Sequence, residues 1–222
     1  MIDPNMKAQH LWSTTLFFPR WPEHEKEAPR IIEFLYQLKS QESENIASGV
    51  APGAKSQQGL FESKFNLFTM DHPGLNKLKV FIGNSLKTAI ATVNGSDSDS
   101  SRIKVSAVDS WFHITNDGGF HDGHHHHNCS WCGIYYVQAG DVDAADTTGG
   151  ARNGVNRFYS PIATGGSYWD FGNEYLRTGN FDVTPEDGLL VLFPSFLLHS
   201  ALAYRGEKDR IVISFNAQAM KG

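Results

Sequence analysis

The spacing of apolar residues changes partway along the chain. Over the first 95 residues they recur mainly at helical intervals, which predicts one helix within residues 23–43 and a stronger one over residues 74–93. Residues 11–18 have the composition of a strand, and residues 47–59 that of a loop. In the stronger helix the apolar positions are Leu75, Leu78, Ile82, Leu86, Ala89 and Val93.

From Ser96 onward, short segments rich in Val, Ile, Phe and Tyr alternate with Gly, Asp and Asn. This pattern is typical of an antiparallel sandwich or jelly roll. We therefore expect a mainly β protein with N-terminal α-helices, in which residues 1–95 pack on a core of residues 96–222 within one structural domain. The irregular stretches 141–154 and 165–180 could form loops around a site. The predicted strands are 102–114, 132–139, 156–163, 181–185, 188–193 and 210–217.

Composition narrows the range of partners. A net charge of −5 without a Lys/Arg cluster gives no electrostatic reason to expect nucleic acid or an anionic membrane. The chain has no run of about 18 apolar residues and no secretory signal pattern. Its two cysteines cannot form a disulfide framework. We expect a cytoplasmic protein, and the helical region could form a homodimer face.

Four consecutive histidines lie directly before a predicted strand, in FHDGHHHHNCSWCGIYYV at residues 120–137. If the run is extended, His124 and His126 point one way, and His125 and His127 point to the opposite, solvent-facing side. His199, after the strand at 188–193, offers a third, remote imidazole. Two neighbouring ligands and a distant one can form a facial metal triad that leaves coordination positions open for chemistry.

The last predicted strand begins with an arginine, Arg210. Arg210, Val212, Ser214 and Asn216 alternate there and share one face. If that face lines the interior, the buried guanidinium needs a partner. A carboxylate of a bound ligand offers the bidentate geometry that arginine favours.

Together these blocks resemble a known family. They are a Trp-bearing strand at Trp111, His-x-His at 124–126, Cys-Gly-Ile-Tyr-Tyr at 132–136, a Gly-to-His block at 188–199 and an Arg-to-Asn block at 210–216. They resemble the 2-oxoglutarate- and Fe(II)-dependent oxygenases, whose fold is the double-stranded β-helix, a cupin-like jelly roll. The resemblance covers about half of the chain.

The resemblance implies Fe(II) bound by His124, His126 and His199, with 2-oxoglutarate as cosubstrate and its distal carboxylate paired with Arg210. Oxidative decarboxylation of 2-oxoglutarate by molecular oxygen would then lead to hydroxylation of a small molecule or of a peptide or protein side chain. The wider superfamily usually has His-x-Asp where this chain has His124-x-His126. Three imidazoles could suffice, or an acid such as Asp122 could reach the metal. Candidates for the cosubstrate pocket are Tyr136 or Tyr135, Trp111, Ser214 and Asn216.

Three other interpretations stay open. Cys129 and Cys132 form a C-x-x-C that could bind structural zinc or take part in thiol redox chemistry. A cupin-like three-histidine metalloenzyme could act without 2-oxoglutarate, with Arg210 as a structural ion-pair partner. A non-enzymatic jelly-roll binding module would use none of these residues for chemistry.

Overall fold

The computed structural model describes residues 13–47, 55–57, 59–95, 100–141, 153–162, 170–172 and 179–222. Two long helices come first, α1 (His24–Ala47) and α2 (Pro73–Asn94), and both agree with the predicted helices. Helix α2 begins with Pro73 at its first position, and the side chain of His72 accepts a hydrogen bond from the Leu75 backbone N–H. The short strands β1 (Lys55–Gln57) and β2 (Leu60–Glu62) and the 3-10 helix η1 (Leu67–Thr69) lie between the two long helices in sequence.

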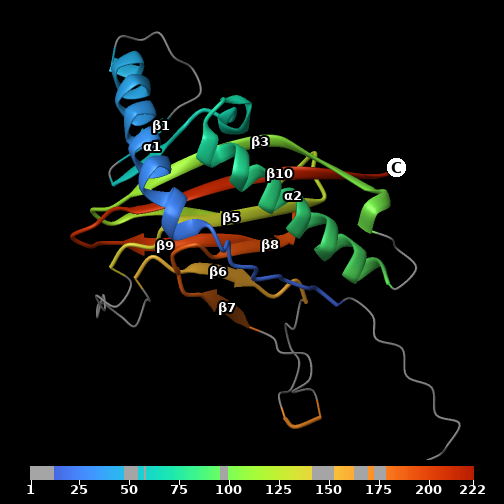
Figure 1. Ribbon diagram of the computed structural model, residues 1–222. Coiled ribbons are helices and arrows are strands. Elements are labelled where there is room, and N and C mark those ends of the chain that lie inside the picture. Colours follow the sequence, from blue (N-terminus) through green and yellow to red (C-terminus); the bar gives the residue numbers. More distant parts are fainter. Residues whose placement is uncertain are drawn as a thin grey trace, which may run out of the picture.

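These two strands and those that follow form two antiparallel sheets that face each other (Figure 1). The larger sheet has the order β1-β2-β3-β10-β5-β8 and the smaller one β4-β9-β6-β7. Strands β3 to β10 are therefore distributed between the sheets in the order of an eight-stranded jelly roll. This confirms the expected double-stranded β-helix. After the 3-10 helix η2 (Ser100–Arg102), the strands are β3 (Ile103–Thr115), β4 (Gly119–His124), β5 (Trp131–Gln138), β6 (Asn156–Tyr159), β7 (Asn180–Val183), β8 (Leu190–Pro194), β9 (His199–Tyr204) and β10 (Arg210–Lys221).

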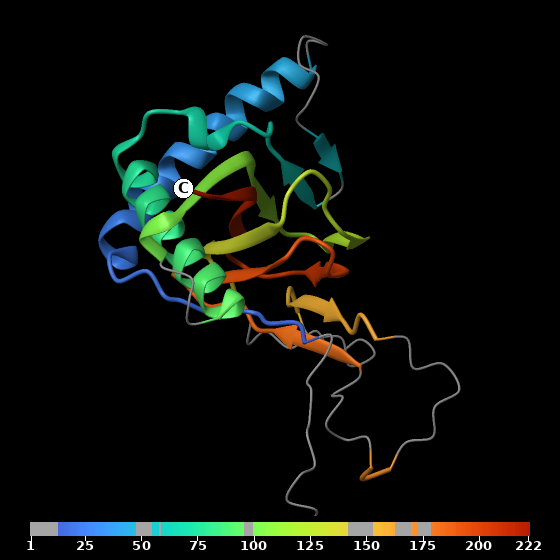
Figure 2. The same cartoon turned by 90° about the vertical axis from the view of Figure 1, so that its right-hand side faces the viewer.

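Strand β10 separates two hydrophobic layers. It pairs with β3 along one edge and with β5 along the other. Its odd-numbered residues Ile211, Ile213 and Phe215 belong to the core shared with α1 and α2, which cover the outer face of the larger sheet (Figure 2). Val212 belongs to the second core, between the sheets. The even face of β10, which carries Arg210, therefore points between the sheets, as the alternation predicts.

Strand β4 contains an irregularity that positions histidines. In its pairing with β9, His121 lies opposite Ala201 and His124 opposite His199, so three residues of β4 span two of β9. Such a β-bulge turns the side chains that follow it relative to a regular strand. As a result, His121 and His124 line the same pocket although their odd spacing would place them on opposite faces of a regular strand.

Several local predictions need correction. The four histidines do not form a continuous strand, because β4 ends at His124. Within the predicted loop 47–59, residues 55–57 pair with β2, and α1 continues to Ala47. Residues 13–18 make only an isolated bridge from Phe17 to Leu192, while residues 11–12 lie outside the described part of the chain. The loops proposed at 141–154 and 165–180 also lie largely outside it.

Neither long helix, nor any other described helix, is long and apolar enough to cross a membrane.

A glycine on β5 allows tight packing across the larger sheet. Gly133 lies opposite Phe215 of β10, and a Cβ built on Gly133 would come within 2.1 Å of the Phe215 ring. We expect Gly133→Ala to lower the free energy of unfolding by about 1–3 kcal/mol, because the buried ring has to move. Gly83→Ala, on α2 where nothing lies within 4 Å of the new methyl group, should instead stabilise the protein by about 0.4–1 kcal/mol. Urea denaturation measures both, and equal effects would contradict this packing.

Candidate active site

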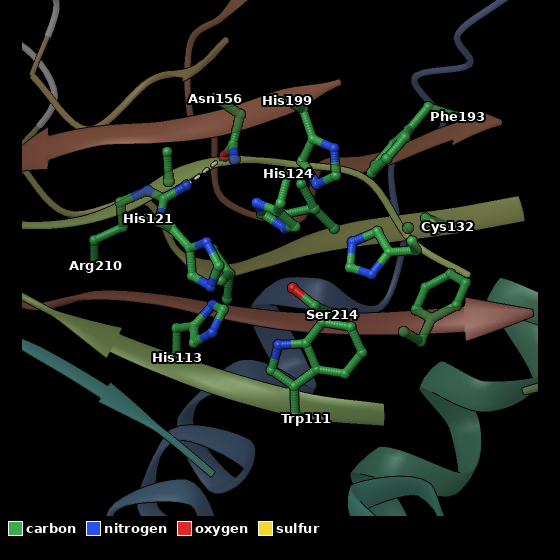
Figure 3. A pocket seen from close by; sticks show the side chains of 16 residues that line it. Trp111, His113, His121, His124, Cys132, Asn156, Phe193, His199, Arg210 and Ser214 are labelled. Carbon is green, nitrogen blue, oxygen red and sulfur yellow. Dashed lines mark hydrogen bonds between the residues drawn. The ribbon is translucent and has the colours of Figure 1, made fainter. Parts of the chain in front are cut away.

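A pocket opens between the two sheets and is rich in imidazole groups (Figure 3). Strand β3 contributes Trp111 and His113, and β10 contributes Arg210, Val212 and Ser214. Strand β8 of the same sheet adds Phe193, and the opposite wall comes from β4, β6, β9 and the segment after β4. The side chains of that opposite wall include His121, His124, His126, Asn156 and His199.

Backbone pairing brings three of the histidines together. His124 lies opposite His199 in the β4–β9 ladder, and the His126 N–H donates to the Ser195 carbonyl at 3.0 Å. The candidate ligand atoms of these three side chains all lie within 4.8 Å of one another. His125 and His127 are exposed, as the alternation predicts, although the run is not a strand.

Hydrogen bonds fix the orientation of two of these rings. The Nδ1 of His124 donates to the Asp122 carbonyl at 2.7 Å, and the Nδ1 of His199 donates to the Leu197 carbonyl at 3.0 Å. In each ring the other nitrogen, Nε2, then carries the lone pair that a metal needs, an arrangement common among metal-binding histidines. Asp122 thus contributes its backbone oxygen, and its carboxylate belongs to neither ligand group found among the described residues.

The three imidazoles are neutral at physiological pH. Burial, together with the neighbouring imidazoles, lowers the pKa of His199 to about 3 and that of His126 to about 4. Burial also lowers the pKa of His124. Neutral imidazole is the form that binds a metal, so these surroundings favour coordination.

Arg210 is only 2% exposed and lies at the end of the same pocket. Its Nη2 donates to Asn156 Oδ1, and its guanidinium carbon lies 5.3 Å from the centre of the Tyr136 ring. Its Nε has no hydrogen-bond partner among the described residues, and none of their carboxylates forms an ion pair with it. A buried charge with only neutral neighbours is costly, which favours an anionic ligand here.

Of the other residues predicted for the pocket, two line it and three do not. Trp111 and Ser214 line the pocket, and the buried Nε1 of Trp111 lacks a partner among the described residues. Tyr136 lies beneath Arg210 and donates from its hydroxyl to Asn156 at 2.7 Å. Asn216 does not line the pocket but contacts Cys132 and Asp109, and Tyr135 points to the helical side, against His24.

Three polar residues in or near the pocket, Asn156, Glu62 and His113, were not predicted. Asn156 lies on a predicted strand, but nothing in its neighbourhood indicates that it holds both Tyr136 and Arg210. Glu62 and His113 pair across β2 and β3, and His121 approaches the same carboxylate. An isolated Glu in an apolar segment, LFES, was the only sequence signal for Glu62.

The two cysteines lie close together, with their sulfur atoms 3.8 Å apart. Neither belongs to a group of three or more potential metal ligands among the described residues. Burial raises the pKa of Cys132, which keeps it as a thiol, whereas both zinc binding and thiol redox chemistry need the thiolate. The geometry therefore favours the histidines over the cysteines as a metal site.

Comparison with known proteins agrees with this geometry. Residues 109–216 match the model of the family described as “Putative 2OG-Fe(II) oxygenase”, where 2OG is 2-oxoglutarate. This segment is a 2OG-Fe(II) oxygenase domain. It extends from β3 to β10 and includes the three histidines and Arg210, and the family's name gives both its metal and its cosubstrate. By this match the protein is an oxidoreductase, although no curated protein matches its sequence.

Solved structures share the fold of the oxygenase domain and of the helices around it. A prolyl-4-hydroxylase from Pseudomonas putida has a TM-score of 0.53 at 14% identity, over 93% of this chain and 94% of that one. HygX from Streptomyces hygroscopicus, solved with nickel, 2-oxoglutarate and hygromycin B, has a TM-score of 0.56 at 10% identity, over 92% and 83%. A prolyl hydroxylase from Trichoplax adhaerens, in complex with a peptide fragment, has a TM-score of 0.52 at 14% identity, over 90% and 82%.

Removal of metal should leave the fold intact. Both hydrophobic cores consist of apolar side chains, and the three histidines line the pocket and belong to neither core. We expect protein treated with a chelator to keep its far-UV circular dichroism spectrum and a cooperative thermal transition. A structural zinc site would give the opposite result, unfolding on chelation.

Proposed function

We propose that the protein is a dioxygenase that binds Fe(II) through His124, His126 and His199 and uses 2-oxoglutarate to hydroxylate a substrate. The observation that carries this proposal is Arg210. It is a buried arginine without a carboxylate partner among the described residues, in the same pocket as three neutral imidazoles. A ligand that combines a metal-chelating group with a distant carboxylate satisfies both features, and 2-oxoglutarate is such a ligand.

Each residue then has a separate task. The three histidines would hold the metal, and the oxo-acid end of 2-oxoglutarate would bind beside them. Bound iron supplies oxidative chemistry that the protein side chains cannot perform. Arg210 orients the far carboxylate, while Asn156 and Tyr136 hold the guanidinium in place. Trp111 and Phe193, both buried, shield the pocket from water.

The substrate belongs to one of two chemical classes, a small molecule or a peptide or protein side chain. Both kinds occur among the similar structures, since HygX was solved with hygromycin B and the Trichoplax adhaerens enzyme with a peptide fragment. We propose hydroxylation as the outcome for either class.

A three-histidine enzyme without 2-oxoglutarate is the second candidate, because no carboxylate lies in the first ligand group. That function would give Arg210 a structural role with an ion-pair partner from the protein. No such partner exists among the described residues, so the 2-oxoglutarate function is the better supported of the two.

Arg210→Met should weaken 2-oxoglutarate binding by at least about 100-fold, because it removes the partner of a buried carboxylate, an interaction worth about 3–5 kcal/mol. Iron binding should be unchanged. Anaerobic titration with Fe(II) and then 2-oxoglutarate, read from the visible charge-transfer band of the chelated oxo acid, measures both. Arg157→Met is the matched control, since Arg157 pairs with Asp182 on β7 and does not line the pocket. Unchanged 2-oxoglutarate affinity in Arg210→Met would refute the assignment.

His199→Ala should lower the Fe(II) affinity of the histidine triad by more than about 100-fold, since even contacts behind a metal ligand contribute 10–100-fold. His127→Ala, which removes an exposed imidazole next to the pocket, should bind Fe(II) like the unmodified protein. Equilibrium binding monitored anaerobically compares the two variants. Equal losses in both would show that the iron binds to the surface histidines.

A further inference from the structure

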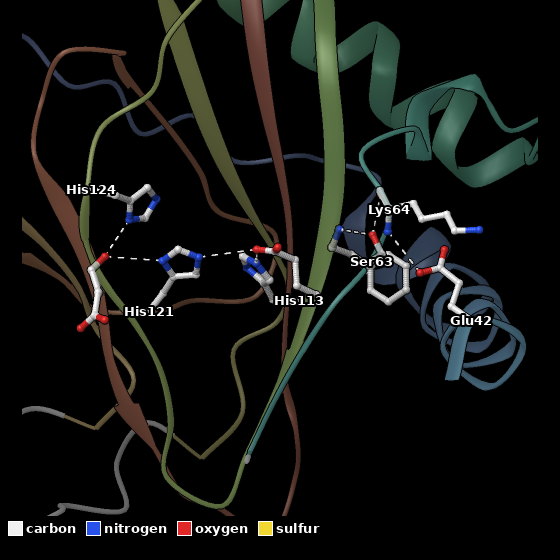
Figure 4. Close-up of polar contacts among 9 residues, drawn as sticks. Glu42, Ser63, Lys64, His113, His121 and His124 are labelled. Carbon is white, nitrogen blue, oxygen red and sulfur yellow. Dashed lines mark hydrogen bonds and ion pairs between the residues drawn. The ribbon is translucent and has the colours of Figure 1, made fainter. Parts of the chain in front are cut away.

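A second group of metal-binding side chains lies beside the first. Glu62 at the end of β2, His113 on β3 and His121 on β4 have ligand atoms that all lie within 4.8 Å of one another. The Nε2 of His113 lies 2.9 Å from Glu62 Oε2, and the Nε2 of His121 lies 3.5 Å from the same oxygen. Figure 4 labels His113 and His121, whose rings approach this almost fully buried carboxylate.

These separations suit coordination. Metal–ligand bonds of about 2.0–2.2 Å place neighbouring ligand atoms about 2.8–3.6 Å apart in tetrahedral or octahedral geometry. The observed 2.9 and 3.5 Å lie within this range, so small side-chain movements could accommodate an ion. Two imidazoles and one carboxylate also form the donor set of many catalytic divalent-metal sites, whereas the first triad has no carboxylate.

The backbone holds this group in place. Glu62 and His113 are directly paired in the β2–β3 ladder, and the bulge in β4 turns His121 toward them. Both histidines line the pocket, so an ion could enter from the same side as the ligands of the first triad (Figure 3). The ring centres of His121 and His124, which belong to different triads, are 4.3 Å apart.

We propose that Glu62, His113 and His121 form a second site for a divalent transition-metal ion, next to the histidine triad in one two-metal pocket. The carboxylate gives this second site a negative charge that the first lacks, so the two sites differ in charge as well as in donors. Mixed nitrogen and oxygen donors suit Zn(II), Co(II) and Fe(II). The inference concerns a different set of residues from the proposed iron site and stands independently of it.

Metal stoichiometry tests the proposal. Metal-free protein is titrated anaerobically with Co(II), whose visible absorption reports coordination, and the bound metal is counted by elemental analysis after gel filtration. We expect two equivalents per chain in the unmodified protein, one in Glu62→Gln and one in His199→Ala. The double variant should retain none. His121→Ala, which truncates a partly exposed side chain, is a second variant in case Glu62→Gln folds poorly, and it should also bind one equivalent.

Two control variants test whether metal binds to side chains outside the pocket. His125→Ala with His127→Ala removes the two exposed imidazoles and should leave both equivalents bound. Glu42→Gln alters a buried carboxylate on α1, which accepts a hydrogen bond from the Lys64 backbone and lies outside the pocket; it should also leave two.

The outcomes also distinguish this inference from the proposed function. One equivalent in the unmodified protein, unaffected by Glu62→Gln and His121→Ala, would overturn the second site and leave the iron proposal intact. If instead His199→Ala kept both equivalents while Glu62→Gln lost one, the histidine triad would fail and the second site would stand. A stoichiometry of two that fell only on removal of His125 and His127 would also overturn the second site.

Discussion

The alternation of side chains along β10 is the constraint on which the rest of the structure depends. This strand pairs on both edges, so its register is fixed by β3 and β5 together. Its apolar residues anchor the helices on one side, and its polar residues face the space between the sheets on the other. A slip by one residue would bury Arg210 against Leu and Ile side chains and leave the pocket without its cation. Folding and ligand binding thus depend on the same register.

Sequence alone was sufficient for features that depend on local periodicity. The two helices, six of the strands and the alternation that orients Arg210 follow from apolar spacing, which backbone geometry converts directly into faces. It was not sufficient where contacts join distant segments. Strand β9 was missed because HSALAY has mixed character, and β4 was missed because its glycines and histidines resemble a turn. Glu62 approaches His121 only through two strand pairings and a bulge, none of which leaves a periodic signal.

The two sets of ligands differ in their electrostatics. Burial keeps the imidazoles of His124, His126 and His199 neutral. In the second set burial raises the pKa of Glu62, but hydrogen bonds from His113 and His121 outweigh it and hold that pKa below its usual range. The same contact raises the pKa of His121. The second group is therefore polarised and the first is not, and Arg210, which has no ion-pair partner among the described residues, adds a fixed positive charge to the same pocket.

The bulge in β4 has a consequence for how such pockets can change over evolution. A single extra residue between His121 and His124 allows both side chains to enter one cavity. A homologue with one residue fewer at this point would have a regular strand, and only a spacing of two would then keep both histidines inside. At the present spacing of three, by contrast, loss of the bulge would turn one of the two histidines to the opposite face and so remove a member of one ligand group while the fold stays the same. The three-residue spacing of these histidines, rather than the length of the histidine run, would be the feature to follow among related sequences.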